Sequence, residues 1–590
     1  MSFANRKPFE GPKRQLVLAF DLGTTFSGIS YALLDPGKVP EIKTVTRYPG
    51  QEAGDSKVQT VFYYSADGKV LAVGAEDPSL DDDFVSEDDW QEVAPLKLEW
   101  FKLLLRPPAV APDPSIPTAH LPPNKDIVAV FADFYAYLFA RARAFIQETH
   151  ASGDLLWDSV KEDVRFVLSH PNGWEGAQQS AMRRAAVLGG LVPDALEGYD
   201  RVTFVSEGEA SFHYCVASGL AADAIETGKN VMIIDAGGGT VDISTYTFAE
   251  ASPIAIEEIA PAECIFQGSV LVRKRASDYL AKRLKDSRFG TPEYVHAISE
   301  EFDKTTKKRF KGAGDSYVKF SNMTADRDPQ AGIRNGQIKL SVDEVASFFQ
   351  PTIDGVIRTI EAQRKAAAPA EISTYLLVGG FAASEFLYAK LRDHLQEQGR
   401  KLFRPDSHTN KAVAEGAVSF HVDHYVSSRV AKVSYGTYVV STYNEEEEEH
   451  RRRAKNAYVD LDGRMVVPGG FACTLEQGTH VAETTVFETP LWKITAQGID
   501  TIVSRIVCYR GAGPCPEWAD EDPDVFTTLC TVSADVSGVP RTPRRGPLNT
   551  EYFTQAFTLV LSFGLTELKA HIAWSDRVRG VLLWRYLSIG

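Results

Sequence analysis

A short pattern occurs at residue 21 and again at residue 235, and it constrains the fold more than any other feature of the chain. In each copy an apolar run with strand character, Leu16–Phe20 or Val231–Asp235, leads into an aspartate and a glycine-containing turn. A second β-prone run, Ser27–Leu34 or Val241–Phe248, follows each turn. Because apolar β-prone runs on either side of a short glycine turn are typical of β-hairpins, we expect two hairpins with equivalent tips.

The two predicted tips carry groups suited to binding phosphate. Their sequences are Asp21-Leu22-Gly23-Thr24-Thr25 and Asp235-Ala236-Gly237-Gly238-Gly239-Thr240. Glycines let the backbone come close enough for its N–H groups to bond phosphate oxygens, and threonine hydroxyls add donors. An aspartate at a strand end can hold Mg²⁺ through water, because Mg²⁺ retains most of its hydration shell. One copy alone would be interpreted as a tight turn, whereas two copies in equivalent contexts favour a clamp around a triphosphate.

Several other classes of protein are disfavoured by what the sequence lacks. It contains neither GxxxxGK[ST] nor GxGxxG, which argues against P-loop and Rossmann folds. The net charge of −16 argues against a surface that follows nucleic-acid phosphates. No apolar run has the length of a signal peptide core or a membrane span, and the 6 cysteines form no CxxC pair. We therefore expect a cytoplasmic protein with no nucleic-acid or membrane partner.

Strands and amphipathic helices alternate from Leu16 to about Tyr425, which is the pattern of an α/β protein. Helices are expected at Ile127–Gln147, Gln178–Leu188, Val270–Ser287, Pro292–Lys311, Val342–Ala366 and Glu385–Gln398. The proline-rich segment Arg106–Pro123 and the acidic segment Asp77–Asp89 have the composition of inserted loops.

Beyond a boundary near Ser427 the sequence favours β structure. Strands are expected at Val433–Tyr443, Val481–Val486, Thr501–Tyr509 and Thr558–Leu561, with no long helix. The charge run formed by Glu445–Glu449 and Arg451–Arg453 is typical of a solvated hairpin loop. The sequence thus predicts one domain over residues 1–426 and a smaller β-rich domain over residues 427–590.

Five ordered motifs between residues 16 and about 425 resemble those of the heat-shock protein 70 family, within the actin-like ATPase superfamily. The segments are 18–27 and 230–242 for the two phosphate motifs, 204–210 and 412–417 for the two connecting helices, and 376–381 for the adenosine motif. The resemblance implies a two-lobed actin-like (ribonuclease H-like) fold that binds ATP or ADP with Mg²⁺.

The resemblance also implies roles for individual residues. Asp21 and Asp235 would hold Mg²⁺ through water. The groups that would contact the nucleotide are Gly23, Thr24, Thr25, Phe26, Gly237, Gly238, Gly239, Asp303, Lys307, Lys308, Gly379, Gly380 and Phe381. The groups implied in hydrolysis are Lys102, Glu207, Thr240 and Asp242, with Lys97 as the alternative lysine. Glu207 and Asp242 would orient the attacking water or the metal shell, and the lysine would offset charge at the γ-phosphate.

The sequence also departs from the family. Phe381-Ala382-Ala383 stands where a serine and an arginine are usual, and the helix at 302–309 is one residue out of the family spacing, so a solvated basic helix is an equal alternative there. The acidic, leucine-rich interdomain linker and a helical lid are missing, which predicts a divergent, lidless branch. The expected function is an ATP-hydrolysing chaperone-like protein in which Mg-ATP drives lobe closure, with a client polypeptide as a candidate partner of the C-terminal region. A nucleotide-dependent scaffold with little turnover and, less favoured, a sugar kinase of the same superfamily remain alternatives.

Overall fold

The computed structural model describes residues 6–51, 54–76, 95–107, 119–174, 176–222, 225–405, 409–482, 484–511, 513–539, 541, 543–547, 549–564, 567–575 and 582–585. The predicted insertion Asp77–Asp89 and the larger part of Arg106–Pro123 lie outside these residues. The chain is a mixed α/β protein that divides into two compact units. The first comprises Met1–Trp174 and Ala181–Val426, and the second comprises Glu175–Ser180 and Ser427–Gly590.

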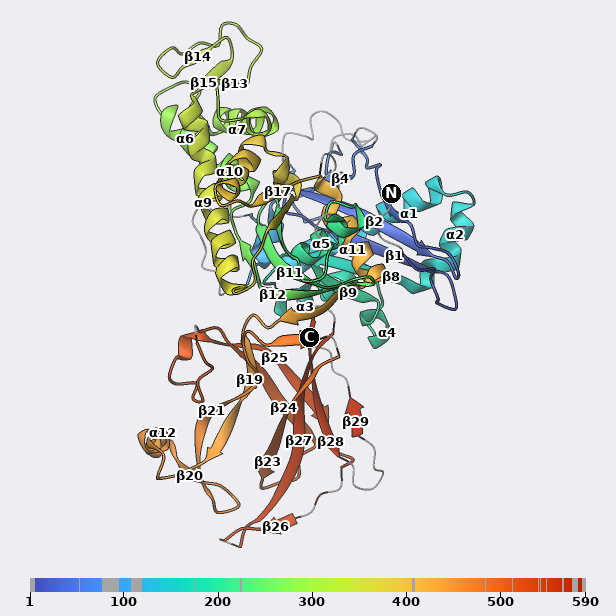
Figure 1. The fold of residues 1–590 in the computed structure, drawn as a ribbon, viewed down its shortest axis with the longest axis vertical. Helices are drawn as coiled ribbons and strands as arrows, with labels where there is room; N and C mark the ends of the chain where they lie inside the picture. Colours follow the sequence, from blue (N-terminus) through green and yellow to red (C-terminus); the bar gives the residue numbers. More distant parts are fainter. Residues whose placement is uncertain are drawn as a thin grey trace. The chain divides into compact units, whose positions relative to one another are not determined.

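The first unit contains two sheets in which five strands follow the same order (Figure 1). One sheet runs β3-β2-β1-β8-β9, with β4 added to β2. Its strands are β1 (Gln15–Asp21), β2 (Phe26–Leu34), β3 (Ile42–Thr44), β4 (Lys57–Gln59), β8 (Val164–His170) and β9 (Val202–Ser206). The hairpin strands β1 and β2 are antiparallel, whereas β1, β8 and β9 are parallel. Burial on both faces explains why β1 is a continuous apolar run.

Five strands of the other sheet repeat this arrangement in the order β12-β11-β10-β16-β17. These strands are β10 (Asn230–Ala236), β11 (Val241–Ala251), β12 (Ile254–Ile265), β16 (Thr374–Val378) and β17 (Lys401–Phe403). Again the hairpin is antiparallel and the next two strands run parallel to its first strand. Both predicted hairpins are therefore confirmed, and each opens a run of five strands with the same order and directions.

Most of the predicted helices are confirmed within a few residues. The helices are α1 (Ile127–Thr149), α2 (Gly153–Val160), α3 (Gly176–Leu188), α4 (Leu196–Tyr199), α5 (Glu207–Ala217), α6 (Ser269–Arg283), α7 (Pro292–Glu301), α8 (Lys307–Arg309), α9 (Val342–Ala366), α10 (Glu385–Gln396) and α11 (Ala412–Asp423). The start of α9 is fixed by a capping box in which Ser341 and Glu344 bond each other's backbone N–H groups. The predicted helix Pro292–Lys311 is helical from Pro292 to Arg309, and it contains a π-helical turn at Phe302–Thr306 between α7 and α8.

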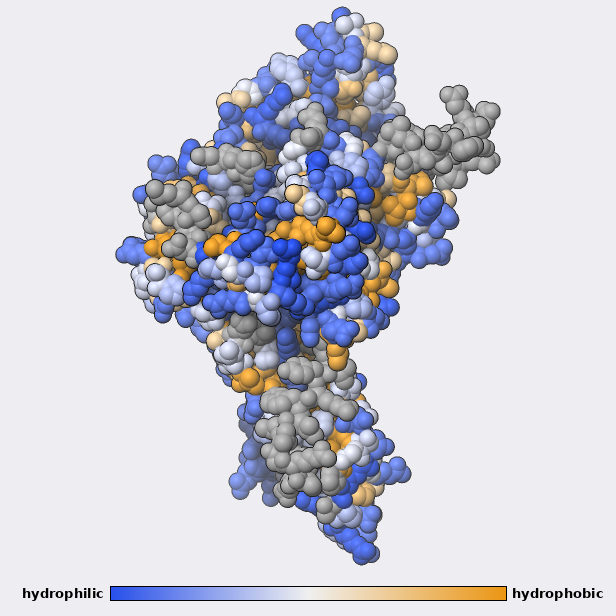
Figure 2. Space-filling view, turned by 90° about the vertical axis from the view of Figure 1, so that its right-hand side faces the viewer, coloured by the Kyte–Doolittle hydropathy of each residue, from blue (hydrophilic) through white to orange (hydrophobic). Residues whose placement is uncertain are grey.

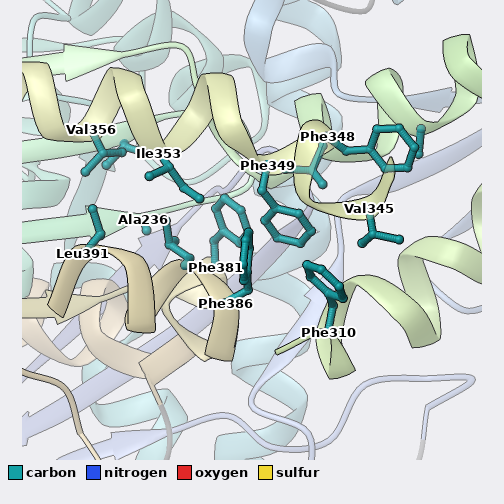
Figure 3. Packing of buried hydrophobic residues seen from close by; sticks show 14 of the residues in the cluster. Ala236, Phe310, Val345, Phe348, Phe349, Ile353, Val356, Phe381, Phe386 and Leu391 are labelled. Atoms are coloured by element: carbon teal, nitrogen blue, oxygen red, sulfur yellow. The ribbon is translucent and has the colours of Figure 1, made fainter. Parts of the chain in front are cut away.

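An aromatic cluster fills the core between α9, α10 and the second sheet. Phe349 of α9 stacks on Phe381 with ring centroids 6.1 Å apart, and it contacts Phe386 of α10 at 5.4 Å. Figure 3 shows these rings pointing toward one another, with Phe310 beside them. Helices α6, α7 and α9 gather at one end of the first unit with a small sheet of order β13-β15-β14 (Figure 1). That sheet comprises β13 (Ser316–Lys319), β14 (Ile333–Arg334) and β15 (Gln337–Leu340).

A further small sheet, of order β6-β5-β7, packs under the first hairpin sheet. Its strands are β5 (Val61–Tyr64), β6 (Val70–Val73) and β7 (Leu96–Glu99). Phe62 of β5 packs against Phe101 and Phe134, which ties the small sheet to α1. A short 3₁₀ helix at Phe101–Leu105 follows β7 and carries Lys102.

The second unit is largely β structure. One sheet runs β20-β21-β19-β24-β25 and another runs β23-β27-β28-β29, with β26 paired to β27. The elements are β18 (Val426–Val430), β19 (Ser434–Thr442), α12 (Glu448–Arg452), β20 (Tyr458–Val459), β21 (Met465–Leu475), β22 (His480–Ala482), β23 (Val486–Thr495), β24 (Thr501–Tyr509), β25 (Phe526–Asp535), β26 (Pro543–Arg545), β27 (Glu551–Gly564), β28 (Glu567–Ser575) and β29 (Leu582–Arg585). Side chains from both sheets, including Ile506 and Leu559, share one core.

In the second unit one local prediction is wrong and another is right only in part, since most of the charge run is exposed as expected. The expected strand Val481–Val486 is interrupted, because a turn bond of 2.9 Å from Thr485 N to Ala482 O ends β22 before β23 begins. The charge run expected as a loop contains the short helix α12, and Arg453 is buried against the Trp518 ring and bonded to Asp520. Arg453 pairs with an acidic partner 67 residues away, which explains why the local sequence did not predict that this arginine is buried.

Among the described residues, no helix has the length and apolar character needed to cross a membrane. Figure 2 shows one face of the molecule, on which hydrophobic side chains form separate groups among hydrophilic ones.

Helices α5 and α11 cross at very short range. A methyl carbon at Gly416 of α11 would lie 1.7 Å from Ala210 O of α5, which is far inside van der Waals contact. Only glycine therefore allows this crossing, which joins α5, packed against β10 and β11, to α11, packed against β1 and β2.

We predict that Gly416→Ala destabilises the chain by about 2 kcal/mol or more, because the methyl group forces the helices apart. A loss of stability would itself indicate the close crossing, because a glycine-to-alanine change inside a helix otherwise stabilises a protein by up to about 1 kcal/mol. Denaturant unfolding measures the effect. Gly355→Ala in α9 is the matched control, because its methyl carbon would meet the flexible Gln267 side chain at 3.3 Å. Equal stability of the two variants would contradict the tight crossing.

Candidate functional site

The two glycine turns touch each other in the first unit. A methyl carbon at Gly238 would lie 2.4 Å from Thr25 Oγ1, and one at Gly239 would lie 2.4 Å from Thr24 Oγ1. The hairpin tips therefore approach so closely that side chains at these glycines would collide with the threonines. We call the space that both turns line, about 590 Å³ in volume, the main cavity.

The backbone of the second turn is held from behind by the start of α6. Gly268 N, Ser269 N and Val270 N donate to the carbonyls of Gly239, Gly237 and Gly238 at 3.0, 3.1 and 2.9 Å. A bond of 2.9 Å from Gly237 N to Thr240 O closes the turn itself. Because these carbonyls are bound by protein amides, they do not present negative charge to an anion in the cavity.

Asp21 and Asp235 lie at the same place in their hairpins, and both line the main cavity. Asp235 accepts a hydrogen bond of 2.5 Å from Ser211 Oγ. Asp21 accepts one of 2.5 Å from Lys57 Nζ and one of 3.4 Å from Ser169 Oγ. The two predicted metal-binding aspartates are thus brought to one cavity from sequence positions 214 residues apart (235 − 21).

The residues predicted to act in hydrolysis lie at different depths. Glu207, the first residue of α5, lines the main cavity and forms a buried ion pair with Lys102. Lys102 also lies 5.7 Å from the centroid of the Trp174 ring. Asp242 is 1% exposed, does not line the cavity, and accepts a bond of 2.5 Å from Asn172 N.

Burial and crowding of carboxylates perturb the acid–base behaviour of this region. Burial raises the pKa of Asp235 to about 7, and the charge of Glu207 adds to the shift. Burial also raises the pKa of Asp242 and of Glu207, the latter offset in part by Lys102. Burial opposes protonation of Lys102, but the charges of Glu207 and Asp21 outweigh it and raise the pKa of this ammonium.

The charges present suit one divalent cation. Asp21, Glu207, Asp235 and Asp242 carry four negative charges when ionised, and Lys57 and Lys102 supply two positive ones, which leaves two uncompensated. No group of three or more His, Cys, Asp or Glu side chains with direct metal-ligand spacing occurs in the part of the chain that the structure describes. The donor set therefore fits a hydrated cation that completes its shell with water and phosphate oxygens better than a cage of protein ligands.

A second cavity of about 390 Å³, which we call the adjoining cavity, shares Thr24, Thr25, Phe26, Gly238, Lys308, Gly380 and Ala383 with the main one. Asp303 and Lys307 line it and form an ion pair with each other. Burial lowers the pKa of Lys307. Phe26 is 46% exposed, so its ring is available to a ligand.

The backbone of the loop after β16 lies very close to the Asp235 side chain, and a glycine makes this possible. Gly379 has φ = +89°, and a methyl carbon there would lie 2.3 Å from Asp235 Oδ1. Phe381, predicted to contact nucleotide, is only 4% exposed and packs on Phe349, although it forms part of the wall of the adjoining cavity. The structure thus assigns the Phe381 ring chiefly to the core.

Of the two candidate lysines, Lys102 lines the main cavity, whereas Lys97 pairs with Glu99 at 3.3 Å and lines the adjoining one. Sequence reasoning missed Lys57, Asn172 and Ser211, which bond Asp21, Asp242 and Asp235. Strand pairing is the signal that reveals Lys57, since it lies opposite Gly28, which lies opposite Asp21.

Comparisons with known proteins agree with the motif resemblance. No protein-family model matches the chain. The chain is 22% identical over 509 residues to Heat shock 70 kDa protein 12A of Mus musculus, with 73% of each chain covered. It is 23% identical over 512 residues to Heat shock 70 kDa protein 12B of Homo sapiens, with 72% of each covered, and 22% identical to Heat shock 70 kDa protein 12A of Homo sapiens. The chain is a divergent relative of the heat-shock protein 70 family.

For this divergent heat-shock protein 70 relative, the raised pKa of Asp235 has a consequence for stability. The unfolded carboxyl titrates near pH 4 and the folded one near pH 7, so the folded state binds more protons between these values. Stability in the absence of ligand therefore falls as the pH rises through this window, and ionised Asp235 destabilises the fold above it.

We predict that Asp235→Asn stabilises the ligand-free chain, and that the gain grows by about 2 kcal/mol between pH 5 and pH 8. Urea unfolding at the two pH values measures it. Asp278→Asn is the control, because Asp278 is exposed and pairs only with the neighbouring Lys274. A gain in stability of the same size at both pH values would show that the pKa of Asp235 is not raised in the folded state.

Proposed function

We propose that this heat-shock protein 70 relative binds Mg-ATP or Mg-ADP, and that residues 1–426 form a two-lobed actin-like (ribonuclease H-like) domain. The observation that carries the proposal is the contact between two aspartate-tipped glycine turns around one cavity. The equal strand order of the two sheets supports the two-lobed fold, because each lobe of such a fold would contribute one hairpin.

In this proposal the two turns bind the phosphates and the adjoining cavity takes the nucleoside. Backbone N–H groups of Gly23, Gly238 and Gly239 donate to phosphate oxygens, and the hydroxyls of Thr24 and Thr25 add further bonds. Gly237 lines the phosphate space, but its N–H is bonded to Thr240 O and closes the turn. Asp21 and Asp235 hold the cation through water, and the bound cation neutralises part of the phosphate charge. Phe26, Asp303, Lys307, Lys308 and the backbone at Gly379–Gly380 border the nucleoside.

Hydrolysis would rest on positioning and charge rather than on a covalent intermediate. Glu207 and Asp242 orient water, Thr240 holds a phosphate oxygen, and Lys102 offsets charge that develops at the γ-phosphate. We further propose that nucleotide binding closes the lobes about the α5–α11 crossing, and that the β-rich residues 427–590 sense the change and engage a client polypeptide in the cytoplasm.

A nucleotide-dependent scaffold with little turnover is the second candidate, and a specific observation favours it. Asp242 lies behind the cavity wall, bonded to Asn172 N, and Glu207 is engaged by Lys102. Both predicted water-orienting carboxylates are therefore occupied by protein groups. Slow turnover follows if these bonds persist when nucleotide is bound.

We predict saturable binding of Mg-ATP in isothermal titration calorimetry, and weaker binding when EDTA removes the metal. Gly238→Val abolishes binding, because its side chain collides with Thr25 and enters the space between the turns. Gly538→Ala is the control, since its methyl group meets open space. Absence of binding by the wild-type chain would refute the proposal.

Steady-state phosphate release then separates the two candidates. For an ATPase, Asp242→Asn reduces release about 100-fold while the affinity for ATP changes less than about three-fold, because asparagine preserves the shape but not the charge. Asp278→Asn leaves both unchanged. Tight binding by the wild-type chain without release above the buffer blank identifies the scaffold.

A further inference from the structure

Lys57 reaches the cavity along an unusual route across the first sheet. Asp21 of β1 pairs with Gly28 of β2, and Gly28 pairs with Lys57 of β4. Directly paired residues place their side chains on the same face of a sheet. The lysine and the aspartate therefore share one face, separated by two strand spacings of about 4.8 Å each, with a glycine between them.

The glycine keeps this route open. A methyl carbon at Gly28 would lie 3.3 Å from Lys57 Cγ and 3.4 Å from Lys57 Cε, so the lysine stem lies directly over the glycine. At the end of that stem, Lys57 Nζ donates to Asp21 Oδ2 at 2.5 Å. The start of β4 is anchored by a bond of 3.1 Å from Gln51 Nε2 to Lys57 O, which fixes the base of the stem.

The ion pair is buried yet borders the cavity. The side chain of Lys57 is 14% exposed and that of Asp21 is 3% exposed, and both line the main cavity with the two glycine turns. An ion pair that only stabilised the fold would not need to border the space proposed for phosphates. In the proposed site the ammonium would face two groups of opposite charge, the Asp21 carboxylate that it already bonds and the phosphates of a bound nucleotide.

We infer that Lys57 is an exchangeable counter-ion of the metal-binding carboxylate. It neutralises Asp21 in the metal-free protein, and on metal binding it releases Asp21 and donates to a phosphate oxygen of the nucleotide. The exchange keeps the charge of the site balanced, because the cation replaces the ammonium at Asp21 and the ammonium then offsets added phosphate charge. This role rests on the proposed function and names a residue outside the predicted motifs.

Binding of Mn²⁺ in the absence of nucleotide tests the exchange directly. Electron paramagnetic resonance of free Mn²⁺ gives its affinity for the full chain. Lys57→Met should bind Mn²⁺ about ten-fold more tightly than the wild-type chain, because the competing ammonium is gone. Lys57→Arg should keep the weak wild-type affinity, since the cation is retained. Unchanged or weaker Mn²⁺ binding by Lys57→Met would overturn the inference and leave Lys57 as a structural partner of Asp21.

The phosphate contact has its own readout. Calorimetry with ATP at saturating Mg²⁺, where the cation has released Lys57 from Asp21, should show an affinity loss of about ten-fold or more for Lys57→Met, because a charge-assisted bond to phosphate is lost. Lys161→Met, an exposed lysine paired with Asp158, is the control and should change neither measurement. An unchanged ATP affinity for Lys57→Met would remove the phosphate step.

Gly28→Ala keeps the test decisive if Lys57→Met fails to fold. Its methyl group displaces the lysine stem without removing the charge, so it should tighten Mn²⁺ binding in the same direction. Failure of the proposed function is distinguishable, because a wild-type chain that binds no ATP still reports competition between Lys57 and Mn²⁺. If ATP binds normally and neither variant alters Mn²⁺ affinity, only the exchange is refuted.

Discussion

The contact between the two glycine turns is the constraint on which the rest of the first unit depends. Thr24 and Thr25 lie where any side chain at Gly239 and Gly238 would have to go, so the tips meet only because these positions are glycine. The equal topology of the sheets then places an aspartate at the end of each hairpin's first strand. In each sheet a parallel strand ends beside that aspartate and supplies Ser169 or the Gly379 loop, so the carboxyl ends of the strands converge on one cavity.

Bringing the tips together concentrates like charges. Asp235 and Asp242 face each other as a pair within one hairpin, and Glu207 raises the pKa of both in addition to burial. Buried carboxylates without full compensation oppose folding, and natural proteins retain such arrangements mainly where a ligand relieves them. The surplus of negative charge over Lys57 and Lys102 is therefore a cost to the fold that a bound cation would offset. Stability and ligand binding are coupled through the same few atoms.

Local patterns predicted what depends on neighbours in sequence. The two hairpins follow from apolar runs around glycine turns, and α9 occupies the predicted Val342–Ala366 because Ser341 and Glu344 cap it locally. The sequence also identified many of the residues that the structure gathers around the cavities, although their roles in binding and hydrolysis remain predictions. What it missed depends on tertiary pairing: Lys57 meets Asp21 only through the register of three strands, and Asn172 meets Asp242 from 70 residues away. For Phe381 the motif predicted a ligand contact, whereas the structure packs most of its ring against Phe349 in the core.

The helix at the nucleoside end of the proposed site contains an irregular turn. The helix that carries Asp303 is one residue out of the family spacing, and the structure places a π-helical turn at Phe302–Thr306, with Lys307 N donating to Phe302 O. A π turn accommodates one extra residue within a helix and is frequent at functional sites. Lys307 and Lys308, which follow this turn, both line the adjoining cavity. Because Phe381 is fixed in the core and Arg404 is bonded to Ala382 O and Glu385, recognition of a base here would depend on these charged side chains and on Phe26 rather than on an arginine stacked from the loop after β16.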